Sequence, residues 1–188
     1  MPVTKKLALH PKPTPELDTP RYLLGDAAAA AGVSPGTLKA WLSRNPRVVT
    51  LGPHDQAGRG KGTPRLLTLR RVYAIAITAE LVSLGFIASR AGVLAFLFTE
   101  VKIVGAELFE KYASFLEVKG DLSLAVRPSR NQSSLEQEFS VFTSQELFLG
   151  DLTSFGAPGS PRSVSCALID CAALMRQVRA RLKERGAA

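Results

Sequence analysis

Basic side chains gather in two short stretches of the N-terminal third of the chain. Lys39, Arg44 and Arg47 form the first stretch, and Arg59 and Lys61 alternate with glycines in the second. Such cations neutralise phosphates and release the counterions condensed on a nucleic acid, and glycine lets the backbone approach a phosphate closely. A solvated basic surface without a partner is the plain alternative, because charge predicts partners only loosely.

The charge of the 188-residue chain is unevenly placed, and its net value is +8. From Met1 to Val72, 12 Lys and Arg stand against 4 Asp and Glu, a balance of +8. From Tyr73 to Ser160 the count is 6 against 10, a balance of −4. A basic third joined to an acidic middle indicates that the two parts do different work.

The residues that would carry catalysis or bind a metal are sparse. His10 and His54 are the two histidines, and neither has a nucleophile or a set of ligands near it in the sequence. The run Gly58–Gly62 lacks the strand–loop–helix context of a nucleotide-binding loop. Cys166 and Cys171 are expected to be buried free thiols in a reducing compartment. We therefore expect no enzyme, no cofactor and no metal site.

No segment of the sequence is typical of export or of membrane insertion. Met1 to Asp18 has no apolar core of a signal peptide. The longest apolar stretch, Val72 to Phe98, is interrupted by Glu80 and Arg90, so its uncharged runs fall short of the ~18 residues that span a bilayer. We expect a cytoplasmic protein without a membrane partner.

Two short helices are predicted within residues 21–44. Ala27 to Ala31 are strong helix formers, and Gly32 ends the first helix because glycine readily takes a left-handed conformation. Ser34 is a good N-cap and Pro35 suits the first helical position of the second helix, which runs to about Ser43. Its apolar side chains have helical spacing and should face a core: Leu38, Trp41 and Leu42.

A β-hairpin and two packed helices are expected next. Arg47 to Leu51 and Arg65 to Leu69 are extended runs, with the glycine-rich tip Gly52 to Pro64 between them. Two helices over residues 70–98 are separated by Gly85, and Val72, Ile75, Ala79, Val82 and Leu84 supply the apolar stripe of the first. A further helix is expected from Thr99 to about Lys111.

The second half of the chain mixes expected strands with a final helix. Phe115 to Val118 should form a hairpin with Leu122 to Val126. Phe139 to Phe142 and Ser163 to Ile169 alternate as strands do, and Asp170 can cap the last helix. The apolar stripe of that helix consists of Leu174, Val178 and Leu182. Dimerisation and intramolecular packing are equally good uses of this stripe.

Several of these segments together resemble the DNA-binding domain of the mercury-resistance-regulator (MerR) family. The segments are Tyr22–Ala27, Ala31–Leu38 with Trp41 and Leu42, Arg65–Val72, and Leu81–Phe86. The resemblance covers residues 21–98 and implies a two-helix unit, a hairpin wing and two more helices. The wing of this chain is longer and richer in glycine, and the family's long dimerisation helix and inducer-binding tail are not evident. Inducer or metal sensing and promoter twisting are therefore not carried over.

The resemblance and the charge pattern predict a DNA-contact surface on the second helix and the wing. A helix fits the major groove with its N-terminal residues facing base edges. Thr37 and Lys39 are expected to contact bases where Gly36 lets the backbone approach, and Ser43 and Arg44 to contact phosphate. The full predicted set is Ser34, Gly36, Thr37, Lys39, Ser43, Arg44, Arg47, Arg59, Lys61, Arg65, Arg70 and Arg71.

The sequence thus predicts an α+β protein with a winged helix-turn-helix followed by a small α+β region that ends in a helix. Residues 1–20 are expected to be a flexible arm, 21–98 the DNA-binding domain, and 99–188 an oligomerisation or effector region. The expected function is sequence-specific binding of double-stranded DNA by a homodimeric transcriptional regulator. The alternatives are a phage-type accessory protein of the excisionase or packaging kind, and a protein-interaction module.

Overall fold

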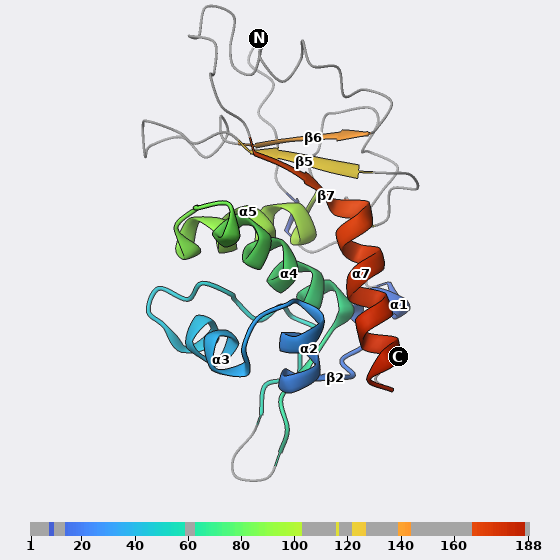
Figure 1. The fold of residues 1–188 in the computed structure, drawn as a ribbon. Coiled ribbons are helices and arrows are strands. Elements are labelled where there is room, and N and C mark those ends of the chain that lie inside the picture. The colour runs from blue at the N-terminus through green and yellow to red at the C-terminus, as the bar shows by residue number, and fades with distance from the viewer. Residues whose placement is uncertain are drawn as a thin grey trace, which may run out of the picture. The chain divides into compact units, whose positions relative to one another are not determined.

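The computed structural model of the chain describes residues 8–9, 14–58, 63–102, 116, 122–126, 139–143 and 167–186. Helices and antiparallel strands together make an α+β protein (Figure 1). The chain divides into two compact units, which are unit 1 (Met1–Val118 with Arg176–Ala188) and unit 2 (Lys119–Met175). This division places the first boundary after Val118, where the sequence predicts one near residue 99, and it assigns the C-terminal segment to unit 1.

Two packed helices form the centre of unit 1. Helix α4 (Leu69–Ser83) begins where the Thr68 side chain accepts a hydrogen bond from the Arg71 backbone N–H. Helix α5 (Ala88–Glu100) packs against α4 after a turn in which Gly85 has a φ of 92°. All residues of α4 from Leu69 to Thr78 are buried, because α1, α2 and α5 surround it. The expected stripe is confirmed at Val72 and Ile75, but it is wrong at Leu84, which is exposed.

The two short helices form as predicted. Helix α2 (Leu24–Ala30) is followed by Gly32 with a φ of 74°, a left-handed conformation that favours glycine. Helix α3 (Pro35–Ser43) begins after Ser34, whose hydroxyl accepts a hydrogen bond from the Thr37 backbone N–H. The apolar side chains of α3 are buried as expected: Leu38, Trp41 and Leu42.

The predicted hairpin between Arg47–Leu51 and Arg65–Leu69 is wrong. Strand β3 (Leu66–Leu67) pairs antiparallel with β2 (Tyr22–Leu23) instead. Val48 and Val49 donate their backbone N–H groups to the Trp41 carbonyl and are buried, so this segment is a packed loop. The Val48 carbonyl lies so close to α5 that a Cβ atom at Gly92 would clash with it. The β-branched Val48 and Val49 are thus buried without pairing with another strand.

Part of the expected flexible arm is packed into unit 1. Helix α1 (Pro15–Asp18) buries Leu17 and Asp18, and strand β1 (Ala8–Leu9) pairs antiparallel with β4 (Val101–Lys102). The flexible-arm prediction is therefore wrong for residues 14–20. The helix expected from Thr99 to Lys111 is wrong at its start, because α5 ends at Glu100 and β4 follows. Residues 103–111 lie outside the described residues.

Unit 2 contains a three-stranded antiparallel sheet in the order β6-β5-β7. Its strands are β5 (Leu122–Val126), β6 (Phe139–Thr143) and β7 (Ala167–Asp170). Leu124 of β5 pairs with Val141 on one side and with Ile169 on the other. Both edges of β5 are thus occupied by β6 and β7, whereas the partner expected from the sequence was Phe115–Val118, of which only Leu116 is among the described residues.

Buried Cys171 follows β7 in unit 2 and begins the last helix. It is a free cysteine, as expected, and burial raises the pKa of its thiol to about 12. The neutral thiol therefore persists at physiological pH. Cys166 lies outside the described residues.

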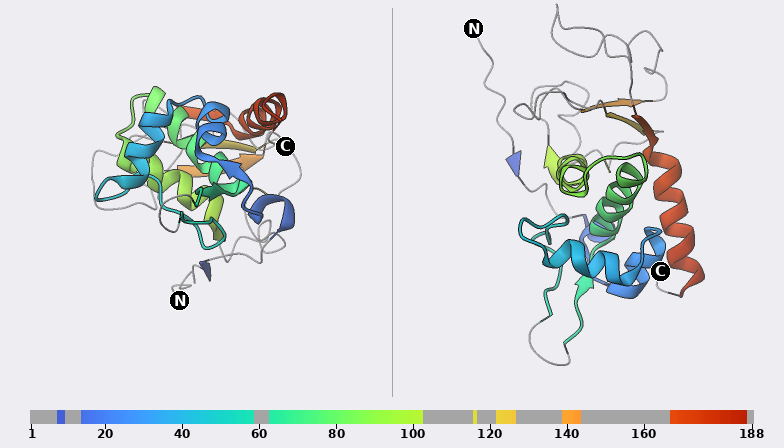
Figure 2. Two further views of the ribbon diagram at one scale, coloured as in Figure 1. Left: turned by 90° about the horizontal axis from the view of Figure 1, so that it is seen from below. Right: turned by 60° about the vertical axis from the view of Figure 1, so that its left-hand side comes forward.

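Helix α7 (Cys171–Glu184) ends against unit 1. Asp170 accepts a hydrogen bond from the Ala173 backbone N–H, as its predicted capping role requires. In the unit 1 part of the helix, Val178 and Leu182 are 0% and 1% exposed, and Arg179 donates to the Tyr73 hydroxyl over 2.6 Å. Figure 2 shows this part of α7 running beside α4 and α2. The structure thus favours intramolecular packing for two members of the apolar stripe.

Across the described ranges, no helix combines the length and the apolar character that spanning a membrane requires.

Candidate nucleic-acid interface

The outer face of α3 carries the residues that the sequence predicts for base contact. Gly36, Thr37 and Lys39 are exposed, as are Ser43 and Arg44 farther along. Gly36, Lys39 and Ser43 stand at positions i, i+3 and i+7, so they lie along one line of the helix. The buried residues of α3 lie on the opposite side, so packing against the core fixes which face meets solvent.

The hydroxyl groups on this face are already engaged within the helix. The Ser34 hydroxyl accepts the Thr37 N–H over 3.0 Å and lies 2.9 Å from the Thr37 hydroxyl. Ser43 donates its hydroxyl hydrogen to the Lys39 carbonyl over 2.7 Å. A phosphate oxygen only accepts hydrogen bonds, so Ser43 would first have to release this bond. The serines therefore shape α3, and the cations are the groups free to bind an anion.

Three cations near α3 have no acidic partner within the described part of the chain. Lys39, Arg44 and Arg47 are all exposed, and no described carboxylate forms an ion pair with them. Lys39 and Arg44, which helical spacing places on the outer side of the second helix, are exposed as expected, and Arg47 is exposed as well. An unpaired exposed cation keeps its full attraction for a phosphate, whereas a paired one must first give up its partner.

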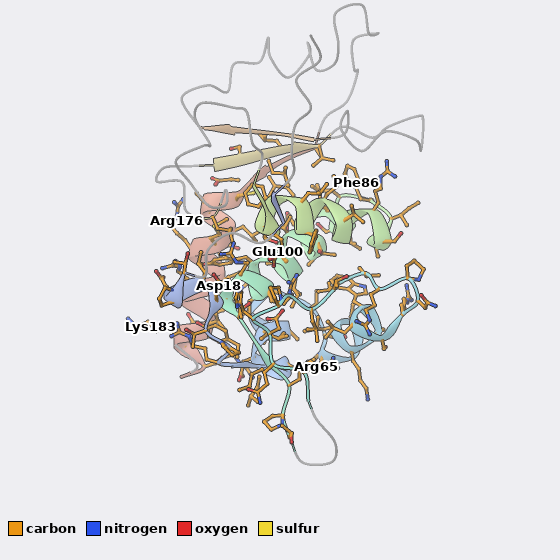
Figure 3. The ribbon with its side chains drawn as sticks, turned by 180° about the vertical axis from the view of Figure 1, so that it is seen from behind. Asp18, Arg65, Phe86, Glu100, Arg176 and Lys183 are labelled. Atoms are coloured by element: carbon orange, nitrogen blue, oxygen red, sulfur yellow. The ribbon has the colours of Figure 1, made fainter. Side chains whose placement is uncertain are left out.

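A narrow loop leaves unit 1 between Gln56 and Leu66. These two residues exchange both backbone hydrogen bonds, at 2.8 and 3.1 Å, which brings the two ends of the loop together. A Cβ atom at Gly58 would lie 2.9 Å from the Thr63 carbonyl, so the two sides stay close above the base. Arg65 is half-buried at this base and is labelled in Figure 3. Arg59 and Lys61, predicted to contact phosphate, lie outside the described residues.

Asp55 holds the base of this loop to α4. Its Oδ1 accepts the backbone N–H and the hydroxyl of Thr68, at 2.8 and 2.9 Å. Its Oδ2 accepts the Gly52 N–H over 2.6 Å and the Arg71 Nε–H over 2.8 Å. One buried carboxylate thus joins both sides of the loop to the first turn of α4, and fixes where the loop starts.

The prediction that Arg70 and Arg71 neutralise phosphate is wrong, because both side chains lie in the interior. Their exposed fractions are 2% and 1%. Arg70 forms two hydrogen bonds to the Asp18 carboxylate, at 2.6 and 2.9 Å, and one to the Thr99 carbonyl. Arg71 binds Asp55 and, through Nη2, the Glu100 carboxylate at 2.7 Å. Asp18 and Glu100 are labelled in Figure 3.

The Asp18 carboxylate is held in its charged form. Burial would raise the pKa of Asp18, but hydrogen bonds from Arg70 and from the Thr14 backbone N–H, together with the positive charge of Arg70, outweigh it and lower that pKa. The pair therefore remains ionised at neutral pH, and Arg70 has no charge to offer to a ligand.

Arg21 is a candidate contact that the sequence analysis did not include. It is exposed and immediately precedes β2, which pairs with β3 at the base of the loop. Its guanidinium lies 5.6 Å from the centre of the Tyr22 ring. Sequence reasoning treated Tyr22, Leu23 and Leu24 only as the lead into the first helix and gave Arg21 no role. The β2–β3 pairing, which brings Arg21 to the loop, depends on residues more than forty positions away.

The chain matches no model of a known protein family, and a search of curated proteins finds no match in sequence. Among the described residues, no group of three or more His, Cys, Asp or Glu side chains could hold a metal ion.

Proposed function

We propose that this chain binds double-stranded DNA through a winged helix-turn-helix in which α3 is the recognition helix. The observation that carries the proposal is the outer face of α3, where Lys39, Arg44 and the adjacent Arg47 are exposed and form no ion pair with any described carboxylate. The opposite face is fixed by buried apolar side chains, so the basic face is presented in one orientation. A rigid helix with a basic outer face suits the major groove, which is about 12 Å wide.

Each part of this surface has a distinct role in the proposal. Gly36 lets the backbone approach the groove, and Thr37 and Lys39 contact base edges near the N-terminus of α3. Arg44 and Arg47 bind backbone phosphates where the helix ends. The loop between Gln56 and Leu66 is the wing and contacts the flanking backbone through Arg65, Arg59 and Lys61. Asp55 positions the wing by holding its base to α4.

The order of elements supports this assignment. Helix α2, the turn at Gly32, helix α3, the wing and helix α4 follow one another in the order that the MerR-like resemblance implies. In this chain the strand that follows the wing pairs with β2, ahead of α2, and this pairing ties the wing to the two-helix unit. The predicted hairpin strand at 47–51 is not needed for that connection.

We infer that two copies bind one DNA site, because a single recognition helix reads only a few base pairs. Val178 and Leu182 of α7 are buried within the chain, so the dimer requires another surface. Leu84 and Ile87, near the α4–α5 turn, are 48% and 75% exposed and favour a protein contact there. Sedimentation of the protein with and without duplex DNA tests this, and Ile87→Asp should shift a dimer to monomers.

Fluorescence anisotropy with a random duplex of about 30 base pairs tests DNA binding. The wild-type protein should bind at ~50 mM salt and weaken linearly in log K against log salt, with a slope of about −0.9 per phosphate contacted. Lys39→Ala with Arg44→Ala should weaken binding at least tenfold. The matched control is Arg176→Ala, which removes an exposed charge from the start of the unit 1 part of α7. Absence of binding at ~50 mM salt would refute the proposal.

The role of the DNA complex is tested by mapping the bound sites across the genome. Binding at many promoters supports the transcriptional regulator that we propose. A single recombination or packaging site supports the accessory-protein alternative. Cellular activity that survives the loss of Lys39 and Arg44 supports the protein-interaction module instead.

A further inference from the structure

The last turn of α7 and the turn that follows it carry basic side chains outside the surface proposed above for DNA binding. Arg181, Lys183 and Arg185 are exposed, and Arg181 and Lys183 stand in the last turn of the helix. No described carboxylate pairs with Lys183. Figure 3 shows the Lys183 side chain pointing away from the body of the molecule.

Two contacts fix this end of α7 against α2. Arg181 donates from Nη1 to the Ala30 carbonyl over 3.1 Å, and the Arg185 Nε lies 2.9 Å from the Asp26 Oδ1. Going four residues forward, from Arg181 in α7 to Arg185 just after it, moves the contact four residues backward along α2, from Ala30 to Asp26. The two helices run antiparallel, and the C-terminal end of α7 lies beside the N-terminal end of α2.

The N-terminal end of α2 is also where the wing joins the two-helix unit. Strand β2 leads directly into α2 and pairs with β3, which directly follows Arg65 at the base of the wing. Figure 1 shows the end of α7, the start of α2 and the base of the wing at the same lower end of unit 1. The second view in Figure 2 keeps this arrangement. The basic end of α7 is therefore continuous with the proposed DNA-binding surface.

The ion pair between Arg185 and Asp26 matters for the charge of this surface. Asp26 lies in the first turn of α2, where the helix dipole would otherwise favour an anion. An unpaired carboxylate at this position would repel a nearby phosphate. Arg185 pairs with this carboxylate, so Asp26 draws no charge from Arg181 or Lys183, and three basic side chains face the two carboxylates Asp26 and Glu184 at this end.

We propose that the C-terminal end of α7 binds backbone phosphates of the DNA that flanks the site read by α3. Lys183 and Arg181 supply the positive charge, and Arg185 neutralises Asp26. This inference rests on the proposed function, because it extends the same DNA site. These contacts go to phosphates, so they add affinity without adding sequence preference.

Lys183→Gln tests the proposal in the salt series described above, with Arg176→Gln as the matched control. Arg176 is an exposed cation seven residues earlier in the same helix, roughly 10 Å away at about 1.5 Å per residue. Lys183→Gln should reduce the slope by about 0.9 and weaken binding about eightfold at ~0.1 M salt, equally for different sequences. Arg176→Gln should change neither quantity.

Asp26→Asn supplies a readout that a purely structural role of the ion pair would not give. The substitution frees Arg185, so binding should become tighter and the salt dependence steeper. Glu80→Gln is its control, because Glu80 is exposed near the far end of α4 from the wing. Weaker or unchanged binding by Asp26→Asn contradicts the assigned role of Arg185.

The outcomes separate this inference from the proposed function. If Lys183→Gln binds like the wild type while Lys39→Ala with Arg44→Ala binds poorly, the α7 contact is refuted and DNA binding through α3 stands. If the wild-type protein fails to bind at ~50 mM salt, both proposals are refuted. Circular dichroism of every variant confirms that the helices remain folded.

Discussion

The exposed basic face of α3 and the buried arginine pair of α4 are opposite uses of the same residue types. Lys39 and Arg44 face solvent, and no carboxylate in the described ranges pairs with them, whereas Arg70 and Arg71 are buried and bound to three carboxylates. In the sequence both pairs belong to one basic region beside the same motif. The difference teaches that the sign of a charge does not reveal whether it serves a ligand or the fold. Partners distant in sequence decide that.

The largest effect is expected from Arg71→Met, which leaves the buried carboxylates of Asp55 and Glu100 without their cation. Removing one partner of a buried ion pair typically costs ~3–5 kcal/mol. Urea denaturation should show such a loss, or no cooperative transition at all. Arg44→Met, the exposed counterpart, should change the free energy of unfolding by no more than ~0.5 kcal/mol.

If Arg71→Met lowers the free energy of unfolding by less than ~1 kcal/mol, the buried arginine pair of α4 and the exposed cations of α3 do not differ in their importance for stability. Where the single variant does not fold, Asp55→Asn and Glu100→Gln added to Arg71→Met should recover part of the stability, because no unpaired charge then remains buried.

Arg70→Met should destabilise the protein by ~3 kcal/mol and release α1 in particular. The substitution leaves Asp18 without the two hydrogen bonds that anchor this short helix to α4. Limited proteolysis should therefore cut within residues 14–20 before the rest of unit 1. Arg44→Met, an exposed arginine at the end of α3, is the control. Equal protection of α1 in both variants would contradict the anchoring role of Arg70.

Acid should weaken the buried pair by protonating Asp18. Because the folded-state pKa of Asp18 is lowered from its usual value of 3.8, its stabilising contribution is fully present above that value. The contribution is lost as the pH falls through the lower folded-state pKa. Between pH 5 and pH 2.5 the free energy of unfolding of the wild type should fall more steeply than that of Asp18→Asn. If the free energy of unfolding depends on pH in the same way in the wild type and in Asp18→Asn, the ion pair with Arg70 does not stabilise the charged form of Asp18.

The smallest effect on stability, and a large effect on binding, is expected from Lys39→Gln with Arg44→Gln. Both side chains lack an acidic partner in the described structure, so the free energy of unfolding should stay within ~0.5 kcal/mol of the wild type. DNA affinity should nevertheless fall at least tenfold. A stability loss above ~1.5 kcal/mol would mean that the outer face of α3 also serves the fold.

Local signals in the sequence predicted the parts of the fold that local interactions determine. Gly32, Ser34 and Pro35 fix the turn and the start of α3 through conformations and caps that involve neighbouring residues, and both helices form where expected. A loop signal predicted β5 as a strand and alternation predicted β6, although neither signal indicated that β6 and β7 would be the partners of β5.

The parts that sequence reasoning missed depend on distant partners. The β2–β3 pairing joins residues 22–23 to 66–67, and Arg71 meets Glu100 across the α4–α5 pair. The stripe of α4 is misjudged at its C-terminal end because α4 is surrounded for its first ten residues and open at Leu84. For the candidate site, sequence reasoning found the exposed residues of α3, and it wrongly added Arg70 and Arg71.

Because the end of α7 belongs to unit 1, unit 1 cannot finish folding until the ribosome has synthesised the C-terminal segment. A ribosome completes α2 and α4 well before it reaches residue 176, by on the order of ten seconds at ~5–20 residues per second. During that interval the apolar surface later covered by Val178 and Leu182 faces water in the nascent chain. Translation that terminates before α7 would release a truncated polypeptide whose apolar surface remains exposed to water. Such a product should bind chaperones or aggregate.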